Sequence, residues 1–273
     1  MTSAMRPFLI DTDTASDDAV ALIMAFAATD VEVVAITTVA GNVGVDQATR
    51  NALYTVELCG SAAPVFRGAA ALLKRPHRHA HWFHGKDGFG DQGYPPPRGK
   101  AQSKHAVDAI IEAAEAHPGL TLVTLGPLTN IALALARQPA LANKIARCVV
   151  MGGAPCCEGN VTPAAEYNIW VDPEAASMVL RSALPVEMVG WQLCRGGAVL
   201  NDGEISATLA LGTAKARFAI DCNSRARAAY KTQTGEDGIA LPDPTAMAIA
   251  LDRSIGTEWS AHYVEVEDRK SVV

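Results

Sequence analysis

The chain has 273 residues, of which 49% are hydrophobic and 19% charged, which is enough apolar sequence for a thick core and too little charge for a disordered protein. Its formal net charge of −6 disfavours a nucleic-acid partner, because proteins that bind the phosphate backbone normally present a basic face. No apolar run reaches the roughly 18 residues that a membrane span needs, and the N-terminus lacks the features of a signal peptide.

Short apolar runs alternate along the chain with alanine-rich stretches of helical length. The runs expected to form strands are Pro7–Ile10, Val31–Val39, Leu120–Leu125, Ala146–Met151 and Pro185–Trp191. The stretches expected to form helices, with apolar residues at a helical period, are Asp17–Ala28, Val45–Cys59, Lys104–His117, Thr129–Arg137 and Pro173–Ala183. This alternation predicts an α/β fold with a mostly parallel, open, Rossmann-like central sheet flanked by helices, in a single domain over residues 1–273.

Two local features stand out between these elements. Asp172 followed by Pro173 has the pattern of a helix start, with proline at the first helical position. The segment Arg75–Gly99 contains four histidines and three consecutive prolines, and is long for a connection in an α/β domain. Such loops are usually functional lids or disordered. Three of its histidines are expected to be ordinary loop residues, since no nearby Cys or Glu completes a zinc site: His77, His79 and His81.

An acidic segment lies at the first expected strand-to-helix turn. It packs four carboxylates into eight residues: Asp11, Asp13, Asp17 and Asp18. The first two are expected to point to one side of an extended chain, and the last two to face them from a helical turn that Ser16 caps. Carboxylates this close repel one another, so solvent, protonation or a cation must offset their charge, and hard oxygens suit Ca²⁺ or Mg²⁺. The alternative is a solvated acidic turn.

Eight motifs follow one another along the chain. They are DTDTASDDAVA from Asp11, AGNV from Ala40, HGKDG from His84, LGPLTN from Leu125, MGG from Met151, GNVTP from Gly159, EYN from Glu166 and DPEAA from Asp172. In this order they resemble the inosine–uridine-preferring nucleoside hydrolases, from about Phe8 to about Glu267. The resemblance implies the nucleoside hydrolase fold and hydrolysis of the N-glycosidic bond of a ribonucleoside to ribose and free base.

The resemblance also implies roles for individual residues. Calcium would be held by Asp13, Asp18, the main-chain carbonyl of Leu125 and Asp243, with positions left for a water and the ribose hydroxyls. Asp13 would be the general base that activates this calcium-bound water. Substrate contacts would come from ribose-binding Asp17, Asn42 and Asn168, from Asn160 and Glu166 at the 5′-hydroxyl, and from His84 on a lid where Trp82 or Phe83 could stack on the base.

Some of these residues also fit simpler interpretations. Asn42 and Asn160 each follow a glycine and could be turn residues. Glu166 and Asn168 alternate with Tyr167 and Ile169, which favours an extended segment with one face buried and one toward a site.

Two positions depart from the family's pattern. Many members carry His before the last Asp, where it helps the departing base accept a proton, whereas this chain has Pro242, which cannot donate one. Cys194, just after an apolar run, is a candidate catalytic replacement, and its alternative is an ordinary buried side chain. The chain also stops at Val273, several tens of residues earlier than is usual in the family.

The expected partner is a small-molecule ribonucleoside, with no nucleic acid and no membrane. Family analogy favours a homodimer or homotetramer. The six cysteines form no CxxC pair, so we expect reduced thiols and a cytoplasmic location.

Two other functions remain open. The turn Asp11–Thr14 fits the nucleophile motif of a haloacid dehalogenase-type phosphatase, but the later Gly-Asp-x-x-Asp pair of such enzymes is missing from the sequence. A nucleoside- or ribose-binding protein without turnover would keep the same aspartates, and Pro242 motivates that alternative.

Overall fold

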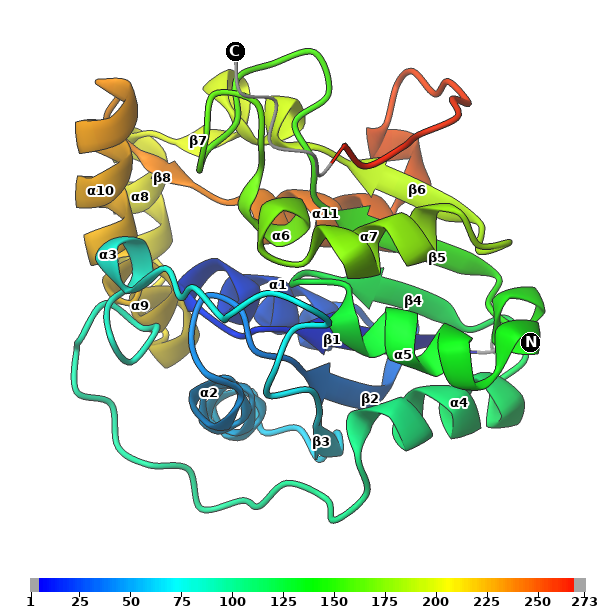
Figure 1. The fold of residues 1–273 in the computed structure, drawn as a ribbon. Coiled ribbons are helices and arrows are strands. Elements are labelled where there is room, and N and C mark those ends of the chain that lie inside the picture. The colour runs from blue at the N-terminus through cyan, green and yellow to red at the C-terminus, as the bar shows by residue number, and fades with distance from the viewer. Residues whose placement is uncertain (1–4, 268–273) are drawn as a thin grey trace.

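A parallel sheet forms the centre of the protein, whose computed structural model describes residues 5–267 (Figure 1). Its strands are β1 (Arg6–Thr12), β2 (Val31–Thr38), β3 (Val65–Arg67), β4 (Thr121–Thr124), β5 (Arg147–Met151) and β6 (Val186–Val189). They lie in the order β3-β2-β1-β4-β5-β6, and every neighbouring pair is parallel. Along the chain, β2 and β3 are added on one side of β1, and β4, β5 and β6 are then added on its other side. The predicted α/β fold is confirmed.

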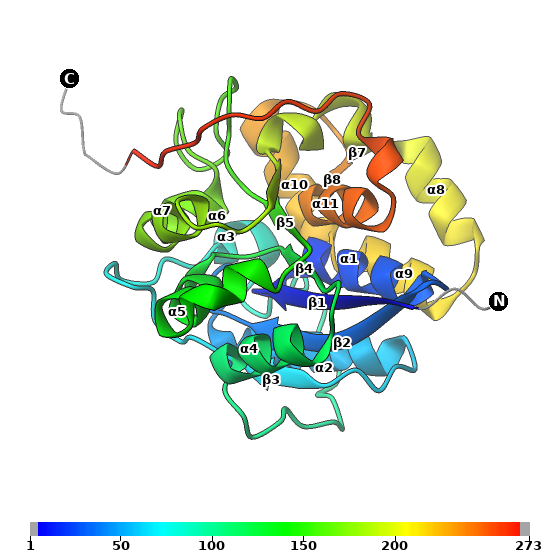
Figure 2. The same ribbon diagram turned by 90° about the vertical axis from the view of Figure 1, so that its right-hand side faces the viewer.

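Helices cover both faces of this sheet (Figure 2). One face packs against α1 (Ser16–Ala27), α2 (Val45–Leu58) and α11 (Pro242–Leu251), and the other against α4 (Ala106–Ala116), α5 (Thr129–Arg137) and α7 (Pro173–Leu180). The remaining elements are α3 (His81–His84), α6 (Tyr167–Val171), α8 (Asp202–Ala210), α9 (Ala214–Asp221), α10 (Ser224–Thr234), the antiparallel pair β7 (Val199–Leu200) and β8 (Ile239–Ala240), and 3₁₀ turns at Pro139–Asn143, Trp191–Cys194, Gly196–Ala198 and Arg253–Ile255.

Each face of the sheet has its own hydrophobic core, and alternate residues of β1 belong to one core or the other. Phe8 and Ile10 pack with α1 and α11, whereas Leu9 packs with α4 and α5. Successive side chains of a strand point to opposite faces, so a strand covered on both faces needs an uninterrupted apolar run. This requirement explains why the five apolar runs correspond to strands.

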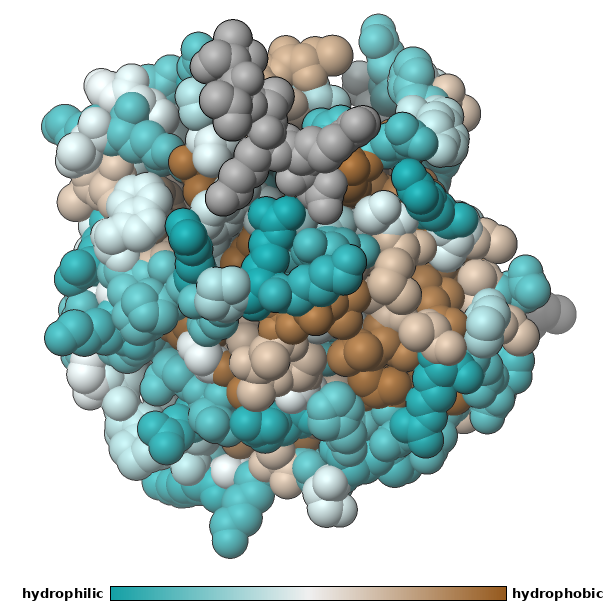
Figure 3. All heavy atoms as spheres, viewed as in Figure 1, coloured by the Kyte–Doolittle hydropathy of each residue, from teal (hydrophilic) through white to brown (hydrophobic). Residues whose placement is uncertain are grey.

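Most buried apolar residues lie in these two cores, and the visible surface is correspondingly polar. The face in Figure 3 is largely hydrophilic, with one apolar area over α5 and α7. Among residues 5–267, none of the helices combines the length and the apolar content that a bilayer crossing requires.

The five predicted strands and five predicted helices all form, with bounds shifted by a few residues. Asp172 caps α7 as expected, since its side chain accepts a hydrogen bond from the Ala175 N–H. The prediction that Ser16 caps α1 is wrong. Ala15 is the N-cap residue, and its N–H donates to Asp18 Oδ2 at 2.8 Å. Asp18 thus takes the capping role, which leaves the Ser16 hydroxyl free for another contact.

The expected extended segment at Glu166–Asn168 is also wrong. Glu166 is the N-cap residue of the short helix α6, and its carboxylate accepts hydrogen bonds from the N–H groups of Asn168 and Ile169. A side chain that satisfies the free N–H groups of a first helical turn favours a helix over the extended alternative. The long loop at Arg75–Gly99 contains the short helix α3 and has no other helix or strand.

The Asp172 carboxylate links three segments of the chain. It is fully buried and accepts from Thr129 Oγ1 at 2.6 Å, from the Leu73 N–H at 3.1 Å and from the Ala175 N–H at 3.2 Å. We expect Asp172→Ala to lower the free energy of unfolding by about 2 kcal/mol or more, because a helix cap and two buried hydrogen bonds are lost together.

Urea denaturation would measure this loss. The matched control is Asn201→Ala, which removes the exposed N-cap of α8 and should cost about 0.5–1 kcal/mol. Equal losses in the two variants would show that Asp172 acts as a cap and nothing more.

Candidate active site

The carboxyl ends of β1 and β4 meet where the strand order reverses. Asp13 follows β1 and Leu125 follows β4, and the next helices, α1 and α5, lie on opposite faces of the sheet. The divergence of these two helices opens a crevice at the strand ends. In open parallel sheets this is the place where ligands bind.

A pocket of about 600 Å³, including its open mouth, lies at these strand ends. Its lining contains eight of the residues that the sequence singled out: Asp17, Asn42, His84, Leu125, Asn160, Glu166, Asn168 and Asp243. Three other candidates are not part of the lining: Asp13, Asp18 and Cys194. The sequence did not single out Tyr167, Trp191 or Gln233 as pocket residues, because single aromatic and amide side chains in loops and short helices carry no distinctive spacing.

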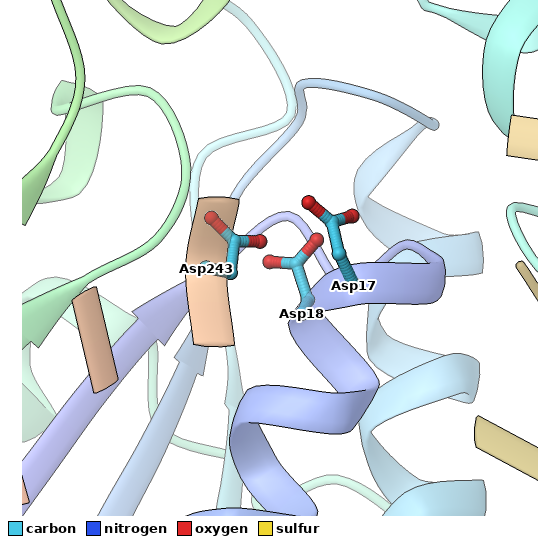
Figure 4. Close-up of side chains that lie close together, drawn as sticks. All are labelled: Asp17, Asp18 and Asp243. Carbon is cyan, nitrogen blue, oxygen red and sulfur yellow. The ribbon is translucent and has the colours of Figure 1, made fainter. Parts of the chain in front are cut away.

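Three buried aspartates from opposite ends of the chain converge at the pocket (Figure 4). Asp17 and Asp18 lie in the first turn of α1, and Asp243 lies in the first turn of α11. One carboxylate oxygen from each can be chosen so that all three atoms lie within 4.8 Å of one another. The structure therefore unites the N-terminal acidic segment with the C-terminal Asp-Pro step.

The other two aspartates of the acidic segment, Asp11 and Asp13, have different hydrogen-bond partners. Asp13 Oδ2 accepts from the Asn42 N–H at 2.5 Å, while its Oδ1 is buried without a hydrogen-bond partner. Asp11 belongs to a different network, where its Oδ1 accepts from Thr37 Oγ1 at 2.5 Å and from Asn130 Nδ2 at 2.8 Å. Asp11 therefore lies apart from the acidic centre, whereas Asp13 is close enough to interact with Asp18 and Asp17.

Burial raises the pKa of every carboxyl group at the acidic centre. The pKa of Asp17 rises to about 6 for this reason, and that of Asp18 to about 6 through burial and then the charge of Asp17. Burial, followed by the charge of Asp18, raises the pKa values of Asp13 and Asp243 well above the usual range. A buried carboxylate without a partner is costly, and Asp13 Oδ1 and Asp17 Oδ1 both lack one. Protonation or a bound cation must therefore offset the negative charge of this site.

Asn168 and Glu166 form a second wall of the pocket. Asn168 Nδ2 donates to the Leu125 carbonyl at 2.9 Å and to the Met151 carbonyl at 3.3 Å. Glu166 accepts from the Asn168 N–H at 2.8 Å and, through its other oxygen, from the Gly153 N–H at 2.9 Å. Burial raises the pKa of Glu166 despite these bonds. The helix cap that sequence inspection missed thus fixes two polar groups of the pocket.

His84 and Asn160 contribute the rest of the polar lining. His84 Nδ1 shares a hydrogen bond with Ser16 Oγ at 2.9 Å and lies 3.8 Å from Asp17 Oδ1, and burial lowers the pKa of His84 to about 4. Asn160 Oδ1 accepts from the Tyr167 N–H at 2.9 Å. Its carbonyl accepts from Gln233 Nε2 of α10 at 2.6 Å. These bonds tie the start of α1, the loop before α6, and the helices α3 and α10 around one opening.

Cys194 lies behind the pocket wall. Its side chain is fully buried, and its Sγ has the Gly190 carbonyl at 3.6 Å and the Pro242 carbonyl at 3.9 Å as acceptors. Burial raises the pKa of this thiol to about 12. Its catalytic role stays a prediction.

Comparison with known proteins assigns the chain to a family. Residues 8–272 match the family model described as "Inosine-uridine preferring nucleoside hydrolase". The chain belongs to this family. Uridine nucleosidase 1 of Arabidopsis thaliana is 45% identical over 185 residues, covering 67% of this chain and 55% of the plant protein. The chain thus spans little more than half of that relative.

Two other relatives cover more of the chain. The inosine-uridine preferring nucleoside hydrolase of Leishmania major is 34% identical over 256 residues, which is 92% of this chain and 81% of that protein. The solved structure of a purine-preferring ribonucleoside hydrolase from Gardnerella vaginalis superposes with a TM-score of 0.85 at 34% identity, over 91% of this chain and 80% of that one. The nucleoside hydrolase fold is confirmed.

Gly41 gives the Asp13 carboxylate its position. A Cβ atom at Gly41 would lie 2.0 Å from Asp13 Oδ2, so any side chain there displaces the carboxylate. If the site catalyses nucleoside hydrolysis with Asp13 as a reacting group, Gly41→Ala should lower kcat/KM by about 10²-fold, the effect of a displacement of about 1 Å. Steady-state kinetics would measure it.

Gly44→Ala is the matched control, because a Cβ at Gly44 would meet nothing within 4 Å. It should keep near-normal kinetics. Normal kinetics in Gly41→Ala as well would mean that Asp13 need not be held in this position.

Proposed function

We propose that this protein hydrolyses the N-glycosidic bond of ribonucleosides to ribose and free base, with Ca²⁺ as its cofactor. The convergence of Asp17, Asp18 and Asp243 on a pocket at the strand ends carries this proposal. Membership of the nucleoside hydrolase family supports the reaction class.

The residues present fit a hard divalent cation. Carboxylates of Asp13, Asp18 and Asp243, together with the Leu125 carbonyl, would hold it, and Asp13 Oδ1 is a buried oxygen with no other partner. Oxygen-only donors favour Ca²⁺ or Mg²⁺ over softer metals, and donors drawn from two helices and two strand ends suit the larger and less regular coordination of Ca²⁺. When bound, the ion would supply positive charge that offsets the carboxylate repulsion and lowers the pKa of a coordinated water.

Asp13 is the proposed general base. Its Oδ2 accepts only the Asn42 N–H and its Oδ1 has no hydrogen-bond partner, so one oxygen can bind the ion while the other accepts the proton of the attacking water. The reaction is a direct displacement by water through a ribosyl state with oxocarbenium character, without a covalent intermediate, as in inverting glycosidases. Positive charge that develops on the sugar faces the buried carboxylates, which stabilise it.

Substrate binding follows from the positions of the other polar groups. Asp17, Asn42 and Asn168 are proposed to bind the ribose hydroxyls, and Asn160 and Glu166 the 5′-hydroxyl. His84 reaches the pocket from α3, whose aromatic residues Trp82 and Phe83 also line it and would exclude water from the base. A cytoplasmic location and a homodimeric or homotetrameric assembly stay predictions from the sequence and the family.

Assay of a panel of purine and pyrimidine ribonucleosides, with ribose scored as reducing sugar, tests the activity. We expect base release that chelator abolishes and Ca²⁺ restores. We expect Asp13→Asn to lose at least ~100-fold in turnover, the low end of general-base contributions. The control is Asp46→Asn, which changes an exposed carboxylate paired with Arg67 and should keep normal turnover.

Each other result has a defined meaning. Near-normal turnover of Asp13→Asn would remove Asp13 from the role of base. Calorimetric binding of a nucleoside without base release would establish a binding protein. Release of phosphate from p-nitrophenyl phosphate would favour a phosphatase, although Asp11 of its supposed nucleophile turn accepts hydrogen bonds from Thr37 and Asn130.

Thermal unfolding tests the cation site without relying on activity. Ca²⁺ at about 100 times its Kd should add about 2.7 kcal/mol of stability, which corresponds to a Tm rise of about 5 °C or more. Asp243→Asn should abolish the rise. Asp252→Asn, at the exposed opposite end of the same helix, should keep it. A larger rise with Mg²⁺ than with Ca²⁺ would assign the site to magnesium, and no rise with either would contradict a resident cation.

A further inference from the structure

The pocket wall is acidic and carries no basic side chain. Its lining includes the carboxylates of Asp17, Glu166 and Asp243, each more than nine-tenths buried, and Asp17 Oδ1 has no hydrogen-bond partner. Among the described residues that line it, none is Lys or Arg. Asp13 and Asp18 are also buried and lie close enough to Asp243 to interact with it. The field in the pocket therefore favours a cationic ligand.

Aromatic rings make up much of the remaining wall. Trp82, Phe83, Tyr167 and Trp191 all line the pocket. The faces of such rings attract organic cations, most strongly in the case of Trp, and the attraction grows as the cation is desolvated. Carboxylates combined with aromatic rings are the surroundings that a flat, positively charged ring system prefers.

Proline occupies one position of the pocket from which a side chain could protonate a departing base, and two other proton-bearing groups are engaged elsewhere. Pro242 lines the pocket and has no proton to donate. The Tyr167 hydroxyl donates to the Arg78 carbonyl at 2.7 Å, and His84 Nδ1 is engaged with Ser16 Oγ. The base of a neutral nucleoside leaves as an anion unless a proton reaches it. Such an anion would form beside the acidic wall, which raises its energy.

We propose that this pocket takes cationic ribonucleosides, in which the base is quaternised at a ring nitrogen, and hydrolyses them in preference to neutral ones. The class comprises N-ribosylpyridinium compounds and N7-alkylated purine ribonucleosides. The inference rests on the proposed nucleoside hydrolysis for its chemistry and adds the charge of the substrate.

The step balances without an acid. The bond between C1′ and the glycosidic nitrogen breaks, and its electron pair passes to that nitrogen and cancels the charge of the base. In N7-alkylated purines the glycosidic nitrogen is N9, which shares the positive charge with N7. The oxygen of water bonds to C1′, and the proton that the water loses passes to Asp13 and then to solvent. The products are ribose, a neutral base and one proton, so the proline at position 242 removes nothing that this reaction needs.

The test compares 7-methylinosine with inosine and 7-methylguanosine with guanosine, each corrected for its spontaneous hydrolysis. In the wild-type protein we expect kcat/KM for the methylated member to exceed that of its parent by about 10-fold or more, a difference of about 1.4 kcal/mol. Because quaternised nucleosides are intrinsically more labile, a second measurement must isolate the contribution of the pocket.

Trp82 supplies that second measurement. Its ring lines the pocket and is 55% exposed, so its replacement should leave the cores intact. We expect Trp82→Leu to lower the ratio of methylated to parent kcat/KM by about 2- to 10-fold, the range of a cation–π contact, and Trp82→Phe to restore part of it. Substrate lability cancels in this comparison, because the same two substrates are used with each variant.

The outcomes separate this inference from the proposed function. A wild-type ratio below about 10, or an unchanged ratio in Trp82→Leu, overturns the cation preference and leaves neutral nucleoside hydrolysis standing. A complete lack of turnover with all four nucleosides overturns the proposed function itself. A high wild-type ratio that falls in Trp82→Leu and recovers in Trp82→Phe supports the inference.

Discussion

Repulsion among buried carboxylates is the constraint that organises this structure. Asp17, Asp18 and Asp243 are held together out of water, where each unpaired charge costs several kcal/mol. Two helix N-termini, those of α1 and α11, point their dipoles at the group and offset part of this cost. At the opposite end of α11, Arg147 Nη1 donates to the Ala250 carbonyl at 3.1 Å and Arg6 Nη2 to the Leu251 carbonyl at 2.9 Å. Two arginines thus anchor the C-terminal end of α11.

The sheet provides the other half of this preorganisation. Asp11 lies on β1, two residues before Asp13. Its carboxylate joins β1 to β2 through Thr37 and to α5 through Asn130. Asn130 in turn holds the Thr38 carbonyl and the Ala69 N–H. The strand ends that present Asp13 and Leu125 are therefore braced from beneath, which limits the rearrangement that ligand binding would require.

The sequence predicted those parts of the fold in which the pattern and the packing coincide. Strands buried on both faces need continuous apolar runs, so β1, β2 and β4 could be recognised, whereas β3, three residues long, could not. The helices α8, α9 and α10 expose most of their surface and carry only weak periodicity. At the site, motifs identified the polar residues. The capping role of Glu166 depends on whether its segment is helical or extended, which residue spacing alone does not decide. Tyr167, Trp191 and Gln233 meet only through tertiary packing.

Pro242 shows how one position can serve the scaffold at the expense of acid catalysis. As the first residue of α11 it has its backbone angle preset for a helix, and it lacks an N–H that would otherwise need a partner. It thereby helps to place Asp243 in the first turn, where the acidic centre needs it. A residue at this position that could donate a proton would have to reach into a pocket already crowded with negative charge, where its protonated form would be held tightly and released reluctantly. With proline there, the proposed hydrolysis receives no proton from this position, and the inferred preference for cationic bases follows because such bases can leave without one.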